Sequence, residues 1–190
     1  MLAKAGRLRA DEIVIDLEDS VAPASKEPAR ELVAGFLAHT EAAAAVAVRV
    51  NVLAGPWGER DVVELTERVG PRIGSFVLPK VERADQLVAV ERLLDTQGER
   101  ASEVRLQALV ETAAGLLHVG EIAAASSRLE ALILGYADLA ASLGRAPGVM
   151  APERWLYAQE TVLVAARAGG LQAIDGPYLE IKDDDKKPDK

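Results

Sequence analysis

The feature that most constrains the fold of this chain is the regular alternation of two kinds of segment. Short runs of β-branched and aliphatic residues are typical of strands that are buried on both faces. We expect strands at residues 12–16, 45–50, 75–79, 104–110, 129–134 and 171–175. Amphipathic segments with helical spacing lie between them, at residues 26–38, 59–69, 84–94, 114–124 and 152–168. Strict alternation of strand and helix predicts a parallel sheet.

Two parallel architectures compete, the doubly wound sheet and the closed barrel. A nucleotide-binding doubly wound sheet needs a glycine-rich turn, and the chain contains neither G-x-G-x-x-G nor G-x-x-x-x-G-K-[ST]. A charged or polar residue lies at or shortly after the end of nearly every expected strand, and in a barrel these ends converge on one mouth. We therefore predict an α/β fold of the TIM (β/α)₈-barrel class. Because we identify only about six strands, we expect a barrel truncated at both ends, with its first and last strands missing.

Composition and charge narrow the possible functions. The chain has no cysteine and only two histidines, which leaves carboxylate oxygen as the main metal ligand and favours a hard cation such as Mg²⁺. A formal net charge of −8 argues against nucleic-acid binding. We find no membrane-spanning run and no signal peptide, so we expect a cytoplasmic location. We expect residues 1–182 to form one incomplete barrel domain and residues 183–190 a charged tail.

Six motifs follow one another in order along the chain. They are DLEDSV at 16–21 with Lys26 and Arg30 after it, VRVN at 48–51, LPKVE at 78–82, VETAAG at 110–115, LGYADL at 134–139 and AGGLQAID at 168–175. Together they resemble the motifs of the citrate lyase β-subunit, malyl-CoA lyase and citramalyl-CoA lyase family, which is part of the HpcH/HpaI aldolase-like superfamily.

The resemblance implies a magnesium-dependent carbon–carbon lyase. Such an enzyme cleaves a β-hydroxyacyl-CoA thioester of the citryl-CoA, malyl-CoA or citramalyl-CoA type into acetyl-CoA and a 2-oxo acid. It implies an acyl-CoA or acyl-carrier-protein thioester as substrate and a homo-oligomer, either trimer or hexamer. Three alternatives stay open: an acyl-CoA thioester hydrolase on the same scaffold, a non-catalytic CoA-binding remnant, and pyruvate-class aldolase chemistry without CoA.

Glu111 and Asp138 are the expected metal ligands. Two carboxylates at the ends of different strands can meet at one point, where Mg²⁺ keeps open positions for water and substrate oxygens. We also expect Glu111 to contact substrate. The competing interpretations are that Asp138 is the N-cap of a helix beginning at Leu139 and that Glu111 is a first-turn helix residue favoured by the helix dipole.

Arg49 is the third expected catalytic residue, since its guanidinium can grip a keto-acid carboxylate with two hydrogen bonds. The competing interpretation is a structural ion pair with Asp16 or Glu18. We expect these two carboxylates to orient Arg49 or a metal-bound water. We expect Lys80 to pair with neighbouring carboxylates rather than to form a Schiff base.

Three further residues are expected to bind substrate. Lys4 resembles a lysine that contacts the CoA phosphates in this family, although a lone helical lysine is usually just solvated. Ile174 and Asp175 lie where the late strand of the family lines the substrate pocket. Asp175, followed by Gly176 and Pro177, also fits an ordinary turn.

Overall fold

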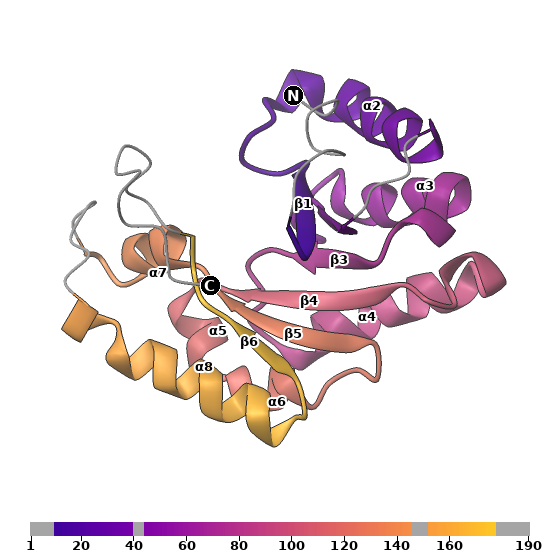
Figure 1. Ribbon diagram of the computed structural model, residues 1–190. Helices are drawn as coiled ribbons and strands as arrows, with labels where there is room; N and C mark the ends of the chain where they lie inside the picture. The colour runs from indigo at the N-terminus through magenta and orange to yellow at the C-terminus, as the bar shows by residue number, and fades with distance from the viewer. Residues whose placement is uncertain (1–9, 40–43, 146–151, 178–190) are drawn as a thin grey trace.

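The structure, a computed structural model, describes residues 10–39, 44–145 and 152–177 (Figure 1). Its strands are β1 (Glu12–Asp16), β2 (Ala45–Arg49), β3 (Ser75–Leu78), β4 (Arg105–Val110), β5 (Leu129–Leu134) and β6 (Gln172–Ile174). Its helices are α2 (Lys26–His39), α3 (Gly58–Val69), α4 (Ala84–Thr96), α5 (Ala113–Leu117), α6 (Val119–Ala123), α7 (Tyr136–Ser142) and α8 (Leu156–Ala168). Short 3₁₀ turns lie at Pro23–Ser25, Gly70–Arg72, Gly98–Ala101 and Pro152–Arg154.

The six strands form one parallel sheet in the order β1-β2-β3-β4-β5-β6. Each strand therefore pairs with the next one along the chain, and every described pair is parallel. This sequential order excludes the doubly wound sheet, in which the strand order reverses at a switch point. The expected strands are confirmed, with ends that differ by a residue at most.

The expectation of a TIM (β/α)₈ barrel is wrong for the described residues, which form an open six-stranded half-barrel sheet. A barrel closes only when its last strand hydrogen-bonds to its first, and it needs eight strands to do so in this fold. Within the described part of the chain, β1 pairs only with β2, and β6 pairs only with β5. The α/β class was predicted correctly, whereas the closed architecture was not.

Two details of the helices also differ from expectation. The helix expected over 114–124 is split into α5 and α6 at His118, whose φ of −100° and ψ of 10° leave the α-helical region. The segment expected over 152–168 opens as a 3₁₀ turn, and α8 itself begins at Leu156. Figure 1 shows the helices along one side of the curved sheet, and no described helix covers its other face.

The main hydrophobic core lies between the sheet and these helices. Residues of alternate strand positions point into it and are almost completely buried: Ile15, Val48, Phe76, Leu106 and Leu132. On the helix side they meet buried aliphatic residues such as Leu37, Leu65, Leu87, Ile122 and Val162. The scarcity of aromatic residues in the composition is therefore matched by a core of aliphatic side chains.

The opposite face of the sheet is layered like the interior of a barrel. A small apolar layer joins the buried Ala47, Val77 and Leu109 with the partly buried Ile133. Towards the amino-terminal strand ends lies a polar layer, in which Gln107 Nε2 donates to carboxylate or hydroxyl oxygens of three strands: Glu12, Ser75 and Glu130. The remaining level of this face, at the carboxyl-terminal strand ends, holds the candidate site.

Candidate metal and substrate site

The period-two geometry of the strands places three predicted site residues on this open face. Side chains two positions apart in a strand point the same way. Asp16 therefore follows Glu12 and Val14, Arg49 follows Ala47, and Glu111 follows Gln107 and Leu109. Each of the three stands at the carboxyl-terminal end of its strand, one level above the small apolar layer.

Asp16 and Arg49 are register partners in β1 and β2, and their side chains form a two-bond ion pair. Arg49 Nε and Nη2 donate to the two oxygens of Asp16, both at 2.7 Å. Burial alone would raise the pKa of Asp16, but hydrogen bonds from Arg49 and from the Glu18 N–H outweigh it and lower the pKa to about 2. The same ion pair raises the pKa of Arg49. The structural pair considered in the sequence is therefore present.

Glu18 connects this pair to a second cation. Its Oε1 accepts a hydrogen bond from Lys80 Nζ at 2.6 Å, and its Oε2 lies 3.3 Å from Arg49 Nη1. The latter contact is an ion pair without hydrogen-bond geometry, since Glu18 Oε2 is buried and has no hydrogen-bond partner among the described residues. Lys26 anchors the loop that carries Glu18, because its buried ammonium donates hydrogen bonds to the carbonyls of Leu17 and Glu18.

Lys80 contacts carboxylates from three different elements. Its Nζ lies 3.0 Å from Asp138 Oδ2 as well as 2.6 Å from Glu18, while its backbone N–H donates to Glu111 Oε1 at 2.9 Å. These ion pairs raise the pKa of Lys80 against the opposing effect of burial. Among the described residues, Lys80 is also the only non-glycine residue with positive φ, at 51°. Such a conformation costs about 1–3 kcal/mol and persists only where the surroundings enforce it.

Glu111 is the most deeply buried member of the group, with 4% of its surface exposed. Burial raises its pKa to about 7, and the nearby charge of Asp138 adds to the rise, while the Lys80 N–H opposes it. Its carboxylate packs against Gly135, where an added Cβ would lie 2.8 Å from Glu111 Oε2. A cation beside Glu111 would lower its pKa again and favour the ionised form at neutral pH.

The interpretations that competed for Glu111 and Asp138 are wrong. Helix α7 begins at Tyr136 with Gly135 as its N-cap, so Asp138 lies inside the first turn and caps nothing. The N-cap of α5 is Thr112, whose Oγ1 accepts a hydrogen bond from the Gly115 N–H. Glu111 thus precedes the helix and points into the carboxylate group instead.

The structure brings six predicted site residues into one connected polar network and leaves two described ones, Ile174 and Asp175, outside it. The network, named the rim network here, consists of Asp16, Glu18, Arg49, Lys80, Glu111 and Asp138. Ile174 and Asp175 instead line a pocket formed by β6, the end of β5 and α8. Asp175 accepts a hydrogen bond from Tyr136 Oη at 2.5 Å and one from the Gly176 N–H. Lys4 and the tail at 183–190 lie outside the described residues.

Several supporting residues were missed by sequence reasoning. Arg30 and Asp61, 2% and 0% exposed, form a buried ion pair at 2.8 Å, and Asp61 also accepts hydrogen bonds from the backbone N–H and side chain of Asn51. This pairing anchors the segment that follows Arg49. Gln159 donates to Tyr136 Oη and so extends the contact with Asp175. Arg30 and Asn51 could have been found in the sequence because they lie in the motifs. Asp61 lies outside the motifs and could not be found in this way.

The rim network fits a divalent cation by its donor chemistry and its charge. Glu111 directly follows β4 and Asp138 lies in the first turn of α7, which follows the neighbouring strand β5, and both are in contact with Lys80. The network has two more acidic groups than basic ones. The described residues contain no cluster of three or more His, Cys, Asp or Glu with metal-binding geometry. That is compatible with Mg²⁺, which proteins often hold through one or two carboxylates while water and substrate supply the remaining ligands.

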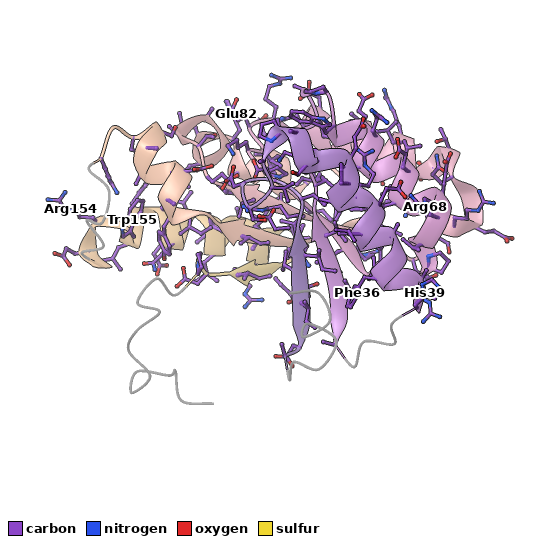
Figure 2. The ribbon with its side chains drawn as sticks, turned by 90° about the horizontal axis from the view of Figure 1, so that it is seen from above. Phe36, His39, Arg68, Glu82, Arg154 and Trp155 are labelled. Carbon is purple, nitrogen blue, oxygen red and sulfur yellow. The ribbon has the colours of Figure 1, made fainter. Side chains whose placement is uncertain are left out.

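Neither His39 nor Trp155 belongs to the rim network: His39 is exposed in the last turn of α2, and Trp155 is buried. Figure 2 shows His39 at the outer edge of the molecule, on the side of α2 and away from Trp155. Trp155 packs edge-on against Tyr136 with ring centroids 5.1 Å apart. In the ranges that the structure describes, no helix has the length and apolar character needed to cross a membrane.

The fold and the site together define a parallel α/β protein with an acidic rim at its carboxyl-terminal strand ends. The chain belongs to the HpcH/HpaI aldolase/citrate lyase family, whose family model matches residues 1–187. The family resemblance seen in the motifs is therefore confirmed.

Individual relatives agree with this assignment. The chain is 37% identical to an L-malyl-CoA/beta-methylmalyl-CoA lyase of Rhodobacter capsulatus, covering 96% of this chain and 64% of the relative. It is equally 37% identical to a (3S)-malyl-CoA thioesterase of Cereibacter sphaeroides, covering 97% of this chain and 61% of the relative. The citrate lyase beta subunit from M. tuberculosis, solved with oxaloacetate and magnesium, superposes with a TM-score of 0.77 at 32% identity, covering 95% of this chain and 74% of that one. The chain thus spans less than two thirds of the length of the malyl-CoA lyase and of the malyl-CoA thioesterase.

Proposed function

We propose that the protein is a magnesium-dependent carbon–carbon lyase acting on a β-hydroxyacyl-CoA thioester. The observation that carries the proposal is the meeting of Glu111 and Asp138 at Lys80, in the same network as Arg49. The names of the relatives support the thioester, because they are lyases and a thioesterase of malyl-CoA-type substrates. The magnesium in the citrate lyase beta subunit structure supports the metal.

Glu111 and Asp138 are the proposed metal ligands. When bound there, Mg²⁺ supplies Lewis-acid polarisation of a substrate oxygen and stabilises negative charge that develops on it. The burial of Glu111 keeps this carboxylate away from bulk water, which strengthens its attraction for a cation. Glu18 and Lys80 belong to the same rim network and are not themselves assigned as ligands.

Arg49 is the proposed anchor for the carboxylate of the 2-oxo acid half of the substrate. Its Nε/Nη2 edge is occupied by Asp16, and among the described residues the Nη1/Nη2 edge faces only Glu18, whose Oε2 lies 3.3 Å from Nη1. Because Asp16 fixes the plane of the guanidinium, Arg49 presents this second edge with little loss of conformational freedom. We propose further substrate contacts for Lys4, Ile174 and Asp175, as the resemblance implies.

In the proposed reaction, the carbon–carbon bond between the hydroxyl-bearing carbon and the α-carbon of the thioester breaks. The hydroxyl loses its proton and becomes the carbonyl of the 2-oxo acid. The electron pair of the broken bond goes to the thioester α-carbon, which takes up a proton to give acetyl-CoA. Arg49 holds the departing 2-oxo acid by its carboxylate throughout, so that only one of the two products is free to move.

A thioester hydrolase is the second candidate, because the malyl-CoA thioesterase is as similar to this chain as the lyase is. The test is to incubate the full chain with malyl-CoA or citramalyl-CoA and Mg²⁺ and to identify products by mass spectrometry. The lyase proposal predicts acetyl-CoA with glyoxylate or pyruvate, and loss of product formation in Arg49→Lys. Free CoA with intact hydroxy acid would establish the hydrolase instead. Thioester binding without turnover would identify a binding remnant.

We also propose that the protein forms a homo-oligomer and acts in the cytoplasm. Large apolar side chains on α8 support the oligomer, since Tyr157 and Val164 are 71% and 65% exposed. Sedimentation velocity would test it: a trimer or hexamer is expected, and a monomer at all concentrations would contradict it.

A further inference from the structure

Lys80 is the residue of the rim network that contacts both proposed metal ligands. Its ammonium bridges Glu18 and Asp138 at 2.6 and 3.0 Å, while its N–H binds Glu111 at 2.9 Å. It is thus in contact with both proposed metal ligands at once, one through its side chain and the other through its backbone. Its positive charge lies between the carboxylates of Glu18 and Asp138, which would otherwise repel each other.

The backbone of Lys80 shows that this placement is enforced. A lysine gains nothing from a φ of 51° by itself, and glycine or asparagine would adopt it at lower cost. The conformation aims the N–H at Glu111 and the side chain at Asp138 from one residue. Strain of this kind is retained where surrounding contacts over-determine it, and such positions cluster at functional sites.

The ammonium and a metal ion would compete for the same oxygen. Asp138 Oδ2 faces Lys80 Nζ at 3.0 Å, and about a third of the Lys80 side chain is exposed, so the ammonium has room to withdraw into solvent. Glu18 Oε1, at the shorter distance, offers the ammonium a second partner that need not be released. A cation arriving at Glu111 and Asp138 would therefore break one of the two ion pairs of Lys80 and keep the other.

We propose that Lys80 is a positioning residue whose ammonium holds Asp138 ready in the metal-free protein and is displaced from it when the divalent cation binds. This inference rests on the proposed metal site of Glu111 and Asp138. The proposal predicts a change in cation affinity of opposite sign to that expected for a structural support. Removing a competitor strengthens cation binding, whereas removing a structural support weakens it.

The test is calorimetric titration of the full chain with MgCl₂, without substrate, in matched variants. Lys80→Asn removes the ammonium but keeps a residue that tolerates positive φ and a backbone N–H donor for Glu111. We expect it to bind Mg²⁺ about tenfold more tightly than the natural protein, from the loss of one nearby positive charge. Lys80→Arg restores the charge and is expected to return the affinity to the natural value. Arg60→Gln removes an exposed cation paired with Glu27 and Glu64 and should leave the affinity unchanged.

The outcomes separate this inference from the metal site itself. If the natural protein binds Mg²⁺ through Glu111, but Lys80→Asn binds it equally or more weakly, the inference is overturned and the metal site stands. If neither binds Mg²⁺, both proposals are overturned. If only Lys80→Asn binds it, the ammonium is a strong competitor and the inference is supported.

A second measurement on the natural protein needs no variant. An amine-acetylating reagent, read out by peptide mass spectrometry, is expected to modify Lys80 faster when Mg²⁺ is present. Lys26 is the internal control, since its ammonium is buried and bonded to two backbone carbonyls, and its modification should stay slow in both conditions. Equal modification of Lys80 with and without Mg²⁺, at concentrations where calorimetry shows binding, would contradict displacement.

Discussion

The backbone N–H of Lys80 donates a hydrogen bond to Glu111 Oε1 at 2.9 Å, from a residue held at a φ of 51°. The contact joins the end of β3 to the end of β4 and orients the most buried carboxylate of the rim network. This hydrogen bond lowers the pKa of Glu111 and so opposes the effect of burial. Without it, the pKa of Glu111 would rise further. The chemistry proposed for the site depends on how this carboxylate is ionised.

The first prediction concerns pH. The pKa of Glu111 is raised from 4.5 to about 7, so the folded state binds a proton more tightly than the unfolded state does. Its contribution to stability is therefore fully present below about pH 4.5 and is lost as the pH rises through 7. Glu111→Gln, which keeps an acceptor for the Lys80 N–H, should stabilise the metal-free protein by about 1–2 kcal/mol at pH 8 and have little effect at pH 4.5. Urea denaturation with EDTA present at both pH values measures this.

An equal effect of Glu111→Gln at the two pH values would show that the carboxylate is not the titrating group. Glu130→Gln is the matched control, because Glu130 lies on the same face of the sheet at the opposite strand ends. The pKa assignment for Glu111 requires that the pH-dependent difference be confined to Glu111→Gln.

The second prediction uses the close contact between Gly135 and Glu111. A Cβ at position 135 would lie 2.6 Å from the Cβ of Glu111 and 2.8 Å from its Oε2, which is too close for either to stay in place. Gly135→Ala should therefore displace Glu111 and weaken Mg²⁺ binding by about tenfold or more, as misplaced ligands do. Gly120→Ala in α6 is the control, since no atom lies within 4 Å of its added Cβ. It should leave Mg²⁺ binding unchanged and stabilise the fold by up to about 1 kcal/mol.

The third prediction concerns the buried pair of Arg30 and Asp61. Asp61→Ala would leave the guanidinium of Arg30 and the amide of Asn51 without this acceptor in the protein interior. We expect a loss of about 3–5 kcal/mol in the free energy of unfolding. Asp85→Ala, which breaks the exposed pair with Arg83, should lower the free energy of unfolding far less. Similar losses in both variants would mean that burial does not govern the strength of these pairs.

Much of the fold was predictable because it depends on local periodicity. The apolar runs of β1 to β6 and the helical spacing of α2, α3 and α4 are each contained within a short window of sequence. Barrel closure is different, since it depends on whether the two outer strands meet, and no local pattern reports that. The break at His118 also depends on tertiary contacts, because its Nδ1 interacts with the carbonyl of Glu82 from another segment.

The candidate site was predictable to the extent that its residues lie in motifs. Arg49, Glu111 and Asp138 could be named in this way, and the parallel order of the strands brings them to one rim. The positive φ of Lys80 could not be predicted from the sequence, because lysine does not favour it and only contacts with surrounding residues impose it. The partner of Arg30 was equally hidden, since Asp61 lies 31 residues away and pairs with it only after α2 and α3 have packed together.

The most direct test of the account is the titration of the full chain with Mg²⁺ at pH 8, compared with Glu111→Gln and Asp138→Asn. If these two carboxylates hold one cation, the natural protein and the control Glu130→Gln will bind a single Mg²⁺ ion with the same affinity, and both ligand variants will lose detectable binding. Binding that survives in Glu111→Gln and Asp138→Asn with unchanged affinity would contradict the metal site and, with it, the proposed lyase chemistry.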